Sequence, residues 1–265
     1  SQMITFVLIG LALFIIYGIY NQIRKNNTVL PLRFFKSKHF TAANIGIFLA
    51  GIASNGPMLL LPLFFQNTKG FTAIEAGLML IPQGLGMMAT RPLIGKMIDR
   101  LGARPVVLVS IAISLLGTIP FIFVQENTNL IWLGLVLFIR GMGIGGLQMP
   151  MMTDIFIGLD KQDIPGASVG QRIIQNVGSS FGSAVISAVV TAVVTSEIAG
   201  QMTTKLHQLA ALHTTLTPTV IATAKTSVEK AVTLNGYQLG FLVSSIVLII
   251  IALPAIFLSQ KKSVK

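Results

Sequence analysis

The densest group of ionisable side chains in this sequence lies between two apolar segments, at residues 95–104. This stretch combines one carboxylate, three basic residues and two glycines: Asp99, Lys96, Arg100, Arg104, Gly95 and Gly102. A carboxylate among cations pairs locally, and it also stabilises the positive N-terminal end of a following helix. Glycine permits the tight chain reversal that a short connection needs. The stretch therefore predicts either a latch that fastens two helices together or an ordinary basic loop.

A second candidate, Arg140, lies near the middle of a long apolar segment. An unpaired guanidinium at the centre of a bilayer costs on the order of 3 kcal/mol or more, so this side chain must face protein or water. Arg140 either lies in a cavity, where it contacts substrate or adjusts a distant carboxylate, or is a structural charge bonded to backbone carbonyls. Arg91 is nearer to a segment end, and its long side chain is expected to extend to the aqueous interface.

Four uncharged polar residues also lie within apolar segments and are candidates to line such a cavity: Asn55, Gln83, Gln148 and Asn176. Each could equally form a hydrogen bond between two helices.

Glycines at four-residue spacing predict close packing between helices, because small residues let backbones approach in a membrane. They are Gly141 with Gly145 and Gly178 with Gly182. Gly141, Gly143 and Gly146 also match a dinucleotide-binding pattern, but no strand precedes them, so packing is the better interpretation.

The eight acidic residues all fall at segment ends or in connections. They are Glu75, Asp99, Glu126, Asp154, Asp160, Asp163, Glu197 and Glu229. Proton coupling needs a carboxylate or histidine whose pKa is shifted inside the bilayer, so the coupling group is expected outside this chain. His207 and His213 are expected to be solvated loop residues. The absence of cysteine excludes a disulfide, a thiolate metal site and a cysteine nucleophile. No catalytic residue, metal site or bound cofactor is expected.

The elements that carry these residues are apolar helices. Hydrophobic residues make up 53% of the 265 positions, charged residues make up 10%, and the mean hydropathy is +0.80. A bilayer core of about 30 Å needs roughly 20 apolar helical residues to cross it. Seven stretches satisfy this length, at residues 3–20, 40–65, 75–95, 105–124, 130–152, 167–195 and 237–259.

The net charge of +11 does not indicate a nucleic-acid partner, because the basic residues lie at the ends of apolar segments rather than in one stripe. Thirteen fall on one side of the expected membrane: Arg24, Lys25, Arg33, Lys36, Lys38, Lys96, Arg100, Arg104, Lys161, Arg172, Lys261, Lys262 and Lys265. Four fall on the other side: Lys69, Lys205, Lys225 and Lys230. By the positive-inside rule, the C-terminus is expected in the cytoplasm and the N-terminus outside.

The stretch at residues 95–104 matches Gly-x-x-x-Asp-Arg-x-Gly-x-Arg and resembles the signature loop of the major facilitator superfamily. Further stretches resemble the second half of its fourteen-span drug:proton antiporter branch, the EmrB/QacA type: residues 62–66, Ala76-Gly77 with Pro82, residues 140–145, residues 166–168, and Gly178 with Gly182. Two positions depart from the pattern of that branch. Gln175-Asn176 stands where Arg-Gln is frequent, and Ser179 replaces a common glycine.

The resemblance implies an all-α transmembrane fold, the seven-helix C-terminal portion of such a transporter. Residues 1–38 would form one accessory helix with a basic cytoplasmic linker, and residues 39–265 a six-helix bundle with a three-plus-three inverted repeat. Because the chain begins at Ser1 and becomes apolar almost at once, an N-terminal transporter half is expected to be missing from it.

The resemblance further implies a conformational-switch role for the signature loop. Asp99 would meet a neighbouring helix end, Arg100 and Arg104 would supply its cationic surroundings, and Gly95 and Gly102 would make the turn close. The parent protein would sit in the bacterial cytoplasmic membrane and use the proton gradient to export amphipathic or cationic compounds by alternating access. Two alternatives stay open: a membrane-embedded lipid-processing enzyme that uses Asp154, Asp160 and Asp163, and a non-transporting membrane scaffold or sensor.

Overall fold

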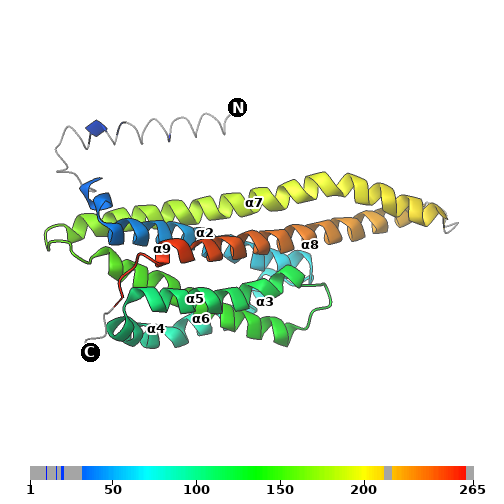
Figure 1. Ribbon diagram of the computed structural model, residues 1–265. Helices are drawn as coiled ribbons and strands as arrows, with labels where there is room; N and C mark the ends of the chain where they lie inside the picture. Colours follow the sequence, from blue (N-terminus) through cyan, green and yellow to red (C-terminus); the bar gives the residue numbers. More distant parts are fainter. Residues whose placement is uncertain (1–9, 11–15, 17–18, 21–31, 212–216, 261–265) are drawn as a thin grey trace.

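The computed structural model describes residues 10, 16, 19–20, 32–211 and 217–260, and the described part of the chain is helical, without strands (Figure 1). Its principal helices are α2 (Lys38–Asn67), α4 (Ile81–Leu101), α5 (Ala103–Thr118), α6 (Leu130–Ile155), α7 (Ile164–Ala211) and α8 (Pro218–Ile250). Shorter elements are η1 (Leu32–Lys36), α3 (Ala73–Leu78), η2 (Ile119–Phe123) and α9 (Ala252–Ala255). The first expected span, residues 3–20, lies almost wholly outside the described residues, so the division at residue 38 stays a prediction.

Five expected spans are confirmed as helices long and apolar enough to cross a membrane. Within the described residues these are Lys38–Asn67, Ala103–Phe123, Leu130–Ile155, Ile164–Leu209 and Pro218–Ala255. They are the helices expected of an integral membrane protein with an all-α fold.

The span expected at residues 75–95 is divided and shifted. Thr72 and Glu75 form a capping box that starts the short α3, and α4 begins only at Ile81. α4 is less apolar than the five spans because it carries Gln83, Arg91 and Lys96. At 21 residues it is still about 31 Å long, which matches the thickness of the hydrocarbon core.

Glycines bring the helix backbones into contact. A Cβ added at Gly182 of α7 would lie 2.6 Å from the Cα atom of Ile52 in α2, and one added at Gly178 would lie 2.5 Å from the Phe48 carbonyl oxygen. On α6, a Cβ at Gly141 would collide with the Gln83 backbone of α4, and one at Gly145 would lie 2.9 Å from Thr90 Oγ1. All four glycines predicted to pack helices therefore face a neighbouring helix.

The connection expected at residues 196–236 is instead a helical hairpin. α7 continues to Ala211 and α8 begins at Pro218, capped by Thr217. Alanine, leucine, lysine and glutamine all favour helix, while the lysines and glutamines lower the hydropathy of this part of the chain. Threonine hydroxyls in both helices donate to the carbonyl four residues earlier. The 48-residue α7 is about 72 Å long, more than twice the thickness of the hydrocarbon core. Figure 1 shows the last part of α7 and the first part of α8 extending together beyond the other helices of the bundle.

The two ends of the bundle differ in charge. The starts of α2 and α5, the end of α4 and the segment after α9 meet at one end, which we call the basic end; it carries Lys36, Lys38, Lys96, Arg100 and Arg104. At the opposite end, Lys69 donates to the carbonyl oxygens of Glu126 and Thr128, the latter at 2.7 Å. Burial lowers the pKa of Lys69, and the nearby Glu126 carboxylate opposes that shift.

We expect Gly182→Val to lower the free energy of unfolding by about 1–3 kcal/mol, because the added side chain forces α7 away from α2. Gly200→Val is the matched control: it makes the same change in the same helix at an exposed position, where an added Cβ meets nothing within 4 Å. Thermal unfolding of the two detergent-solubilised variants measures the difference. Equal melting temperatures would show that the α2–α7 contact does not limit stability.

Candidate functional site

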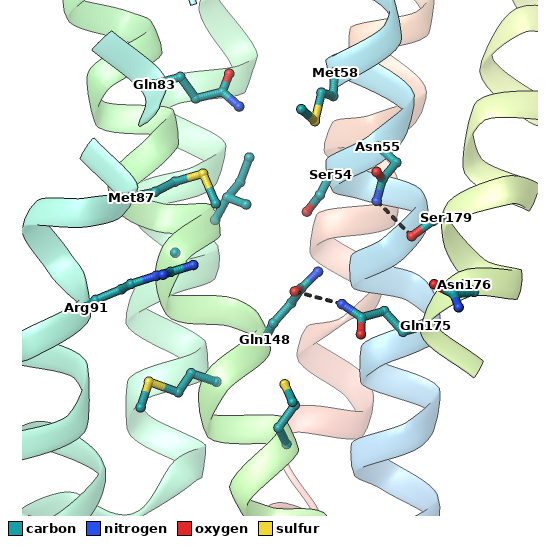
Figure 2. Close-up of a pocket in the computed structure, with 14 residues that line it drawn as sticks. Ser54, Asn55, Met58, Gln83, Met87, Arg91, Gln148, Gln175, Asn176 and Ser179 are labelled. Carbon is teal, nitrogen blue, oxygen red and sulfur yellow. Dashed lines mark hydrogen bonds between the residues drawn. The ribbon is translucent and has the colours of Figure 1, made fainter. Parts of the chain in front are cut away.

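A cavity of about 660 Å³ lies between α2, α4, α6 and α7 (Figure 2). Eight of its lining residues are polar: Ser54, Asn55, Gln83, Arg91, Gln148, Gln175, Asn176 and Ser179. Figure 2 shows α4 contributing side chains from one wall, α2 and α7 from the opposite wall, and Gln148 of α6 between them.

Amide side chains form hydrogen bonds across the cavity wall. Asn55 Nδ2 donates to Ser179 Oγ at 2.9 Å and so links α2 to α7. Gln175 Nε2 donates to Gln148 Oε1 at 3.0 Å, which links α7 to α6. Gln171 Nε2 extends this chain by donating to Gln175 Oε1 at 3.2 Å. These bonds satisfy part of each amide between helices and leave other polar atoms facing the cavity.

The structure brings together four of the five cavity candidates from the sequence, Asn55, Gln83, Gln148 and Asn176. Arg140 does not line the cavity, which was one of the two alternatives predicted for it, because it is fully buried next to Gln83. Its Nη1 donates to Gln83 Oε1 at 2.8 Å. A guanidinium only donates hydrogen bonds, so it fixes the Gln83 amide with the oxygen towards Arg140 and leaves the NH₂ group for the cavity.

The remaining guanidinium nitrogens of Arg140, Nε and Nη2, are buried without a hydrogen-bond partner among the described residues. Arg140 is fully buried because the helices pack closely around it, and Gly117 of α5 lies directly against its backbone.

Arg91 also departs from its predicted position. It was expected to extend to the aqueous interface, but it lies on the cavity wall and points inwards (Figure 2). Gln83, Met87 and Arg91 are four residues apart, so they share one face of α4. That spacing was the signal in the sequence that could have placed Arg91 in the cavity. Among the described lining residues, Arg91 is the charged one, and none is acidic.

Methionines supply much of the apolar wall: Met58, Met87, Met149 and Met152. Their unbranched, polarizable side chains adapt to differently shaped apolar surfaces. The wall therefore suits compounds that share size and hydrophobicity rather than one exact outline.

Residues 95–104 reverse the chain more tightly than the predicted loop would. α4 continues to Leu101 and α5 begins at Ala103, so the chain reverses at Gly102, whose φ of 86° favours glycine. Asp99 and Arg100 are exposed in the last turn of α4, and the Arg104 amide donates to the Ser259 carbonyl at 2.9 Å. Gly95 does not form the turn: it lies within α4, and a Cβ added there would meet nothing within 4 Å.

Asp154 is a functional candidate in an unexpected setting. Predicted at a loop, it lies in the last turn of α6 and is fully buried. It accepts hydrogen bonds from the Ser259 amide at 3.1 Å and from the Ser259 hydroxyl, and His39 Nδ1 lies 3.3 Å from its Oδ2 atom. One carboxylate thus joins α6 to the start of α2 and to the segment after α9. Among the described residues, no three His, Asp or Glu side chains are placed to hold a metal ion.

We expect Asp154→Ala to free the segment after α9, because the Ser259 amide and hydroxyl lose their acceptor. A buried donor left unpaired costs about 1–3 kcal/mol. Hydrogen exchange at residues 256–260 should accelerate by roughly tenfold or more, whereas the exposed Asp160→Ala should leave it unchanged. Unchanged exchange in Asp154→Ala would show that other contacts hold this segment.

Comparison with known proteins agrees with the helical architecture. The Major Facilitator Superfamily profile matches residues 3–163. A multidrug resistance protein B homolog of Mycobacterium tuberculosis is 32% identical over 144 residues, 54% of this chain and 27% of the relative. A putative multidrug resistance protein MdtD of Pectobacterium carotovorum is 33% identical over 161 residues, 60% of this chain and 34% of the relative.

The lincomycin resistance protein LmrB of Listeria innocua is 24% identical over 171 residues, 64% of this chain and 35% of the relative. The chain thus spans about a third of the length of these curated relatives. Because the family profile covers more than half of the sequence, and five helices are long and apolar enough to cross a membrane, this chain belongs to the Major Facilitator Superfamily.

Proposed function

We propose that this chain is the C-terminal half of a proton-coupled multidrug antiporter that exports amphipathic, often cationic compounds. The observation that carries the proposal is the cavity of about 660 Å³, with its amide groups and methionines on four helices. Its volume falls in the range of sites for drug-sized ligands, and its mixture of apolar wall and few polar groups is typical of them. Relatives named for multidrug and lincomycin resistance support the same substrate class.

In this proposal, an N-terminal transporter half would close the cavity from the other side. Transporters of this architecture bind substrate between two halves and rock them around the site. The described cavity residues include no carboxylate, so the proton-coupling carboxylate would belong to the other half. The basic end of the bundle would face the cytoplasm, as the positive-inside rule requires.

Asp99 would control the rocking motion from outside the cavity. Its carboxylate lies in the last turn of α4, beside the turn at Gly102 and the start of α5. The free backbone amides at the start of a helix attract a carboxylate, so a bond that forms in one conformation and breaks in the other would bias the equilibrium between them.

The first test is efflux of a fluorescent lipophilic cation from cells that express the full-length gene. Wild type should export the dye, and a protonophore should abolish that export. Asp99→Asn should slow it by about tenfold at normal surface expression, corresponding to about 1.4 kcal/mol in the limiting step. Asp160→Asn is the matched control on the basic end and should export at the wild-type rate. A wild type that moves none of a broad dye panel would contradict drug export.

A second test concerns the charge of the cavity. Because Arg91 lines it, removing this charge should favour cations. At about 8–10 Å and an effective dielectric constant of about 20, one unit charge contributes about 2 kcal/mol. Arg91→Gln should therefore raise the affinity for a monocationic dye by roughly thirtyfold and lower that for an anionic dye of similar size.

Binding of both dyes to the purified full-length protein measures this ratio. Arg172→Gln removes the same charge from an exposed position on α7 that does not line the cavity, and it should leave the ratio unchanged. If Arg91→Gln behaves like Arg172→Gln, then Arg91 does not face bound substrate.

A further inference from the structure

A second hollow lies on the outer surface of the bundle, away from the central cavity. It measures about 550 Å³ and separates the start of α2 from the end of α8 and α9. We call it the lateral groove. One wall is a face of α2, with Lys38, Thr41, Ala42, Ile45 and Leu49. The opposite wall consists of Ile250, Leu253, Pro254 and Phe257, and Phe35 and Lys36 lie at the entrance.

The lateral groove is polar at one end and apolar along the rest of its length. Both lysines lie at the basic end, and no acidic residue lines the groove. Its apolar side chains are exposed, with Ile45 at 48% and Leu253 at 63% along the groove and Phe257 at 59% near the basic end. The described residues provide neither lysine with an ion pair.

The length of the groove corresponds to one leaflet of a bilayer. From Lys38 to Leu49 its α2 wall rises about 16 Å, which is half of the roughly 30 Å hydrocarbon core. With the basic end at the membrane surface, the lysines would lie at the level of the lipid headgroups and the apolar residues at the level of the acyl chains. Thr41 adds no free donor, because its hydroxyl donates to the Phe35 carbonyl at 2.7 Å.

We propose that the lateral groove binds one anionic phospholipid from the leaflet at the basic end. The lipid phosphate would lie between Lys36 and Lys38, and an acyl chain would run along Ile45 and Leu253. Charge and length select this occupant. Two unpaired ammonium groups attract an anionic headgroup, while the apolar wall below them continues for the depth of an acyl chain.

The break between α8 and α9, beside the groove, would give the bound lipid a second role, in stabilising the fold. α8 ends at Ile250, and Pro254 has no amide hydrogen to offer the carbonyl four residues earlier. The segment that follows is held by Asp154, which also contacts His39 at the start of α2. Both walls of the groove are therefore joined at one carboxylate, so a bound lipid would stabilise the same junction.

Native mass spectrometry of the purified full-length protein tests the proposal, with phosphatidylglycerol and phosphatidylcholine supplied at equal concentration in mixed micelles. Wild type should retain one phosphatidylglycerol at least tenfold more strongly than phosphatidylcholine. The double variant Lys36→Gln, Lys38→Gln should lose that preference by about tenfold. The matched double variant Lys205→Gln, Lys225→Gln removes two exposed lysines from the distant hairpin and should keep it.

Two further arms identify the source of the anion and the place of the acyl chain. Glycerol phosphate at millimolar concentration should not displace the lipid, since it lacks the chain that fills the apolar wall; displacement would assign the site to free phosphate instead. Leu253→Trp should reduce retention of both lipids. Equal retention of the two lipids by wild type, or unchanged preference in the Lys36, Lys38 variant, would overturn the proposal.

Discussion

Contact between backbones is the constraint on which this bundle depends. Lipid is as apolar as the helices, so their association relies on close packing rather than on the removal of apolar surface from water. α6 meets this demand on two sides. Gly141 and Gly145 face α4, while Gly143 and Gly146 lie against Ser114 and Ser110 of α5. Because α4 approaches so closely, Gln83 comes within hydrogen-bonding distance of Arg140 and fills the space between that charge and the cavity.

The two most deeply buried charges are stabilised to different degrees. Asp154 has partners from three parts of the chain, and such a carboxylate behaves as a structural junction. Arg140 has one hydrogen bond to a side chain, and its other guanidinium nitrogens are buried without partners among the described residues. A buried cation in this state is costly unless an anion approaches it. The contrast separates a residue that holds helix ends together from one whose guanidinium keeps unused hydrogen-bond donors among the described residues.

Hydropathy was sufficient to predict the fold class and five spans, because apolar length reports directly on the membrane core. It failed at the hairpin, where alanine, leucine, lysine and glutamine favour helix although the segment is not uniformly apolar. The polar residues of the cavity could be predicted from the sequence for a similar reason, because Asn55, Gln148 and Asn176 are polar residues among apolar neighbours. The role of Asp154 could not be predicted from the sequence, because its partners Ser259 and His39 are 105 and 115 positions away along the chain. The direction of Arg91 likewise depended on which face of α4 meets other helices.

The length of α7 makes that helix a lever arm. Gln175, Asn176 and Ser179 lie on the cavity wall, and the helix then continues without a proline to Ala211. The distance from Ser179 to Ala211 is about 48 Å along the axis. If the segment near the basic end is the pivot, a tilt that moves the cavity wall by one ångström carries the hairpin tip through several. A reporter attached to the aqueous tip would therefore magnify the motion of the wall without touching the residues that bind.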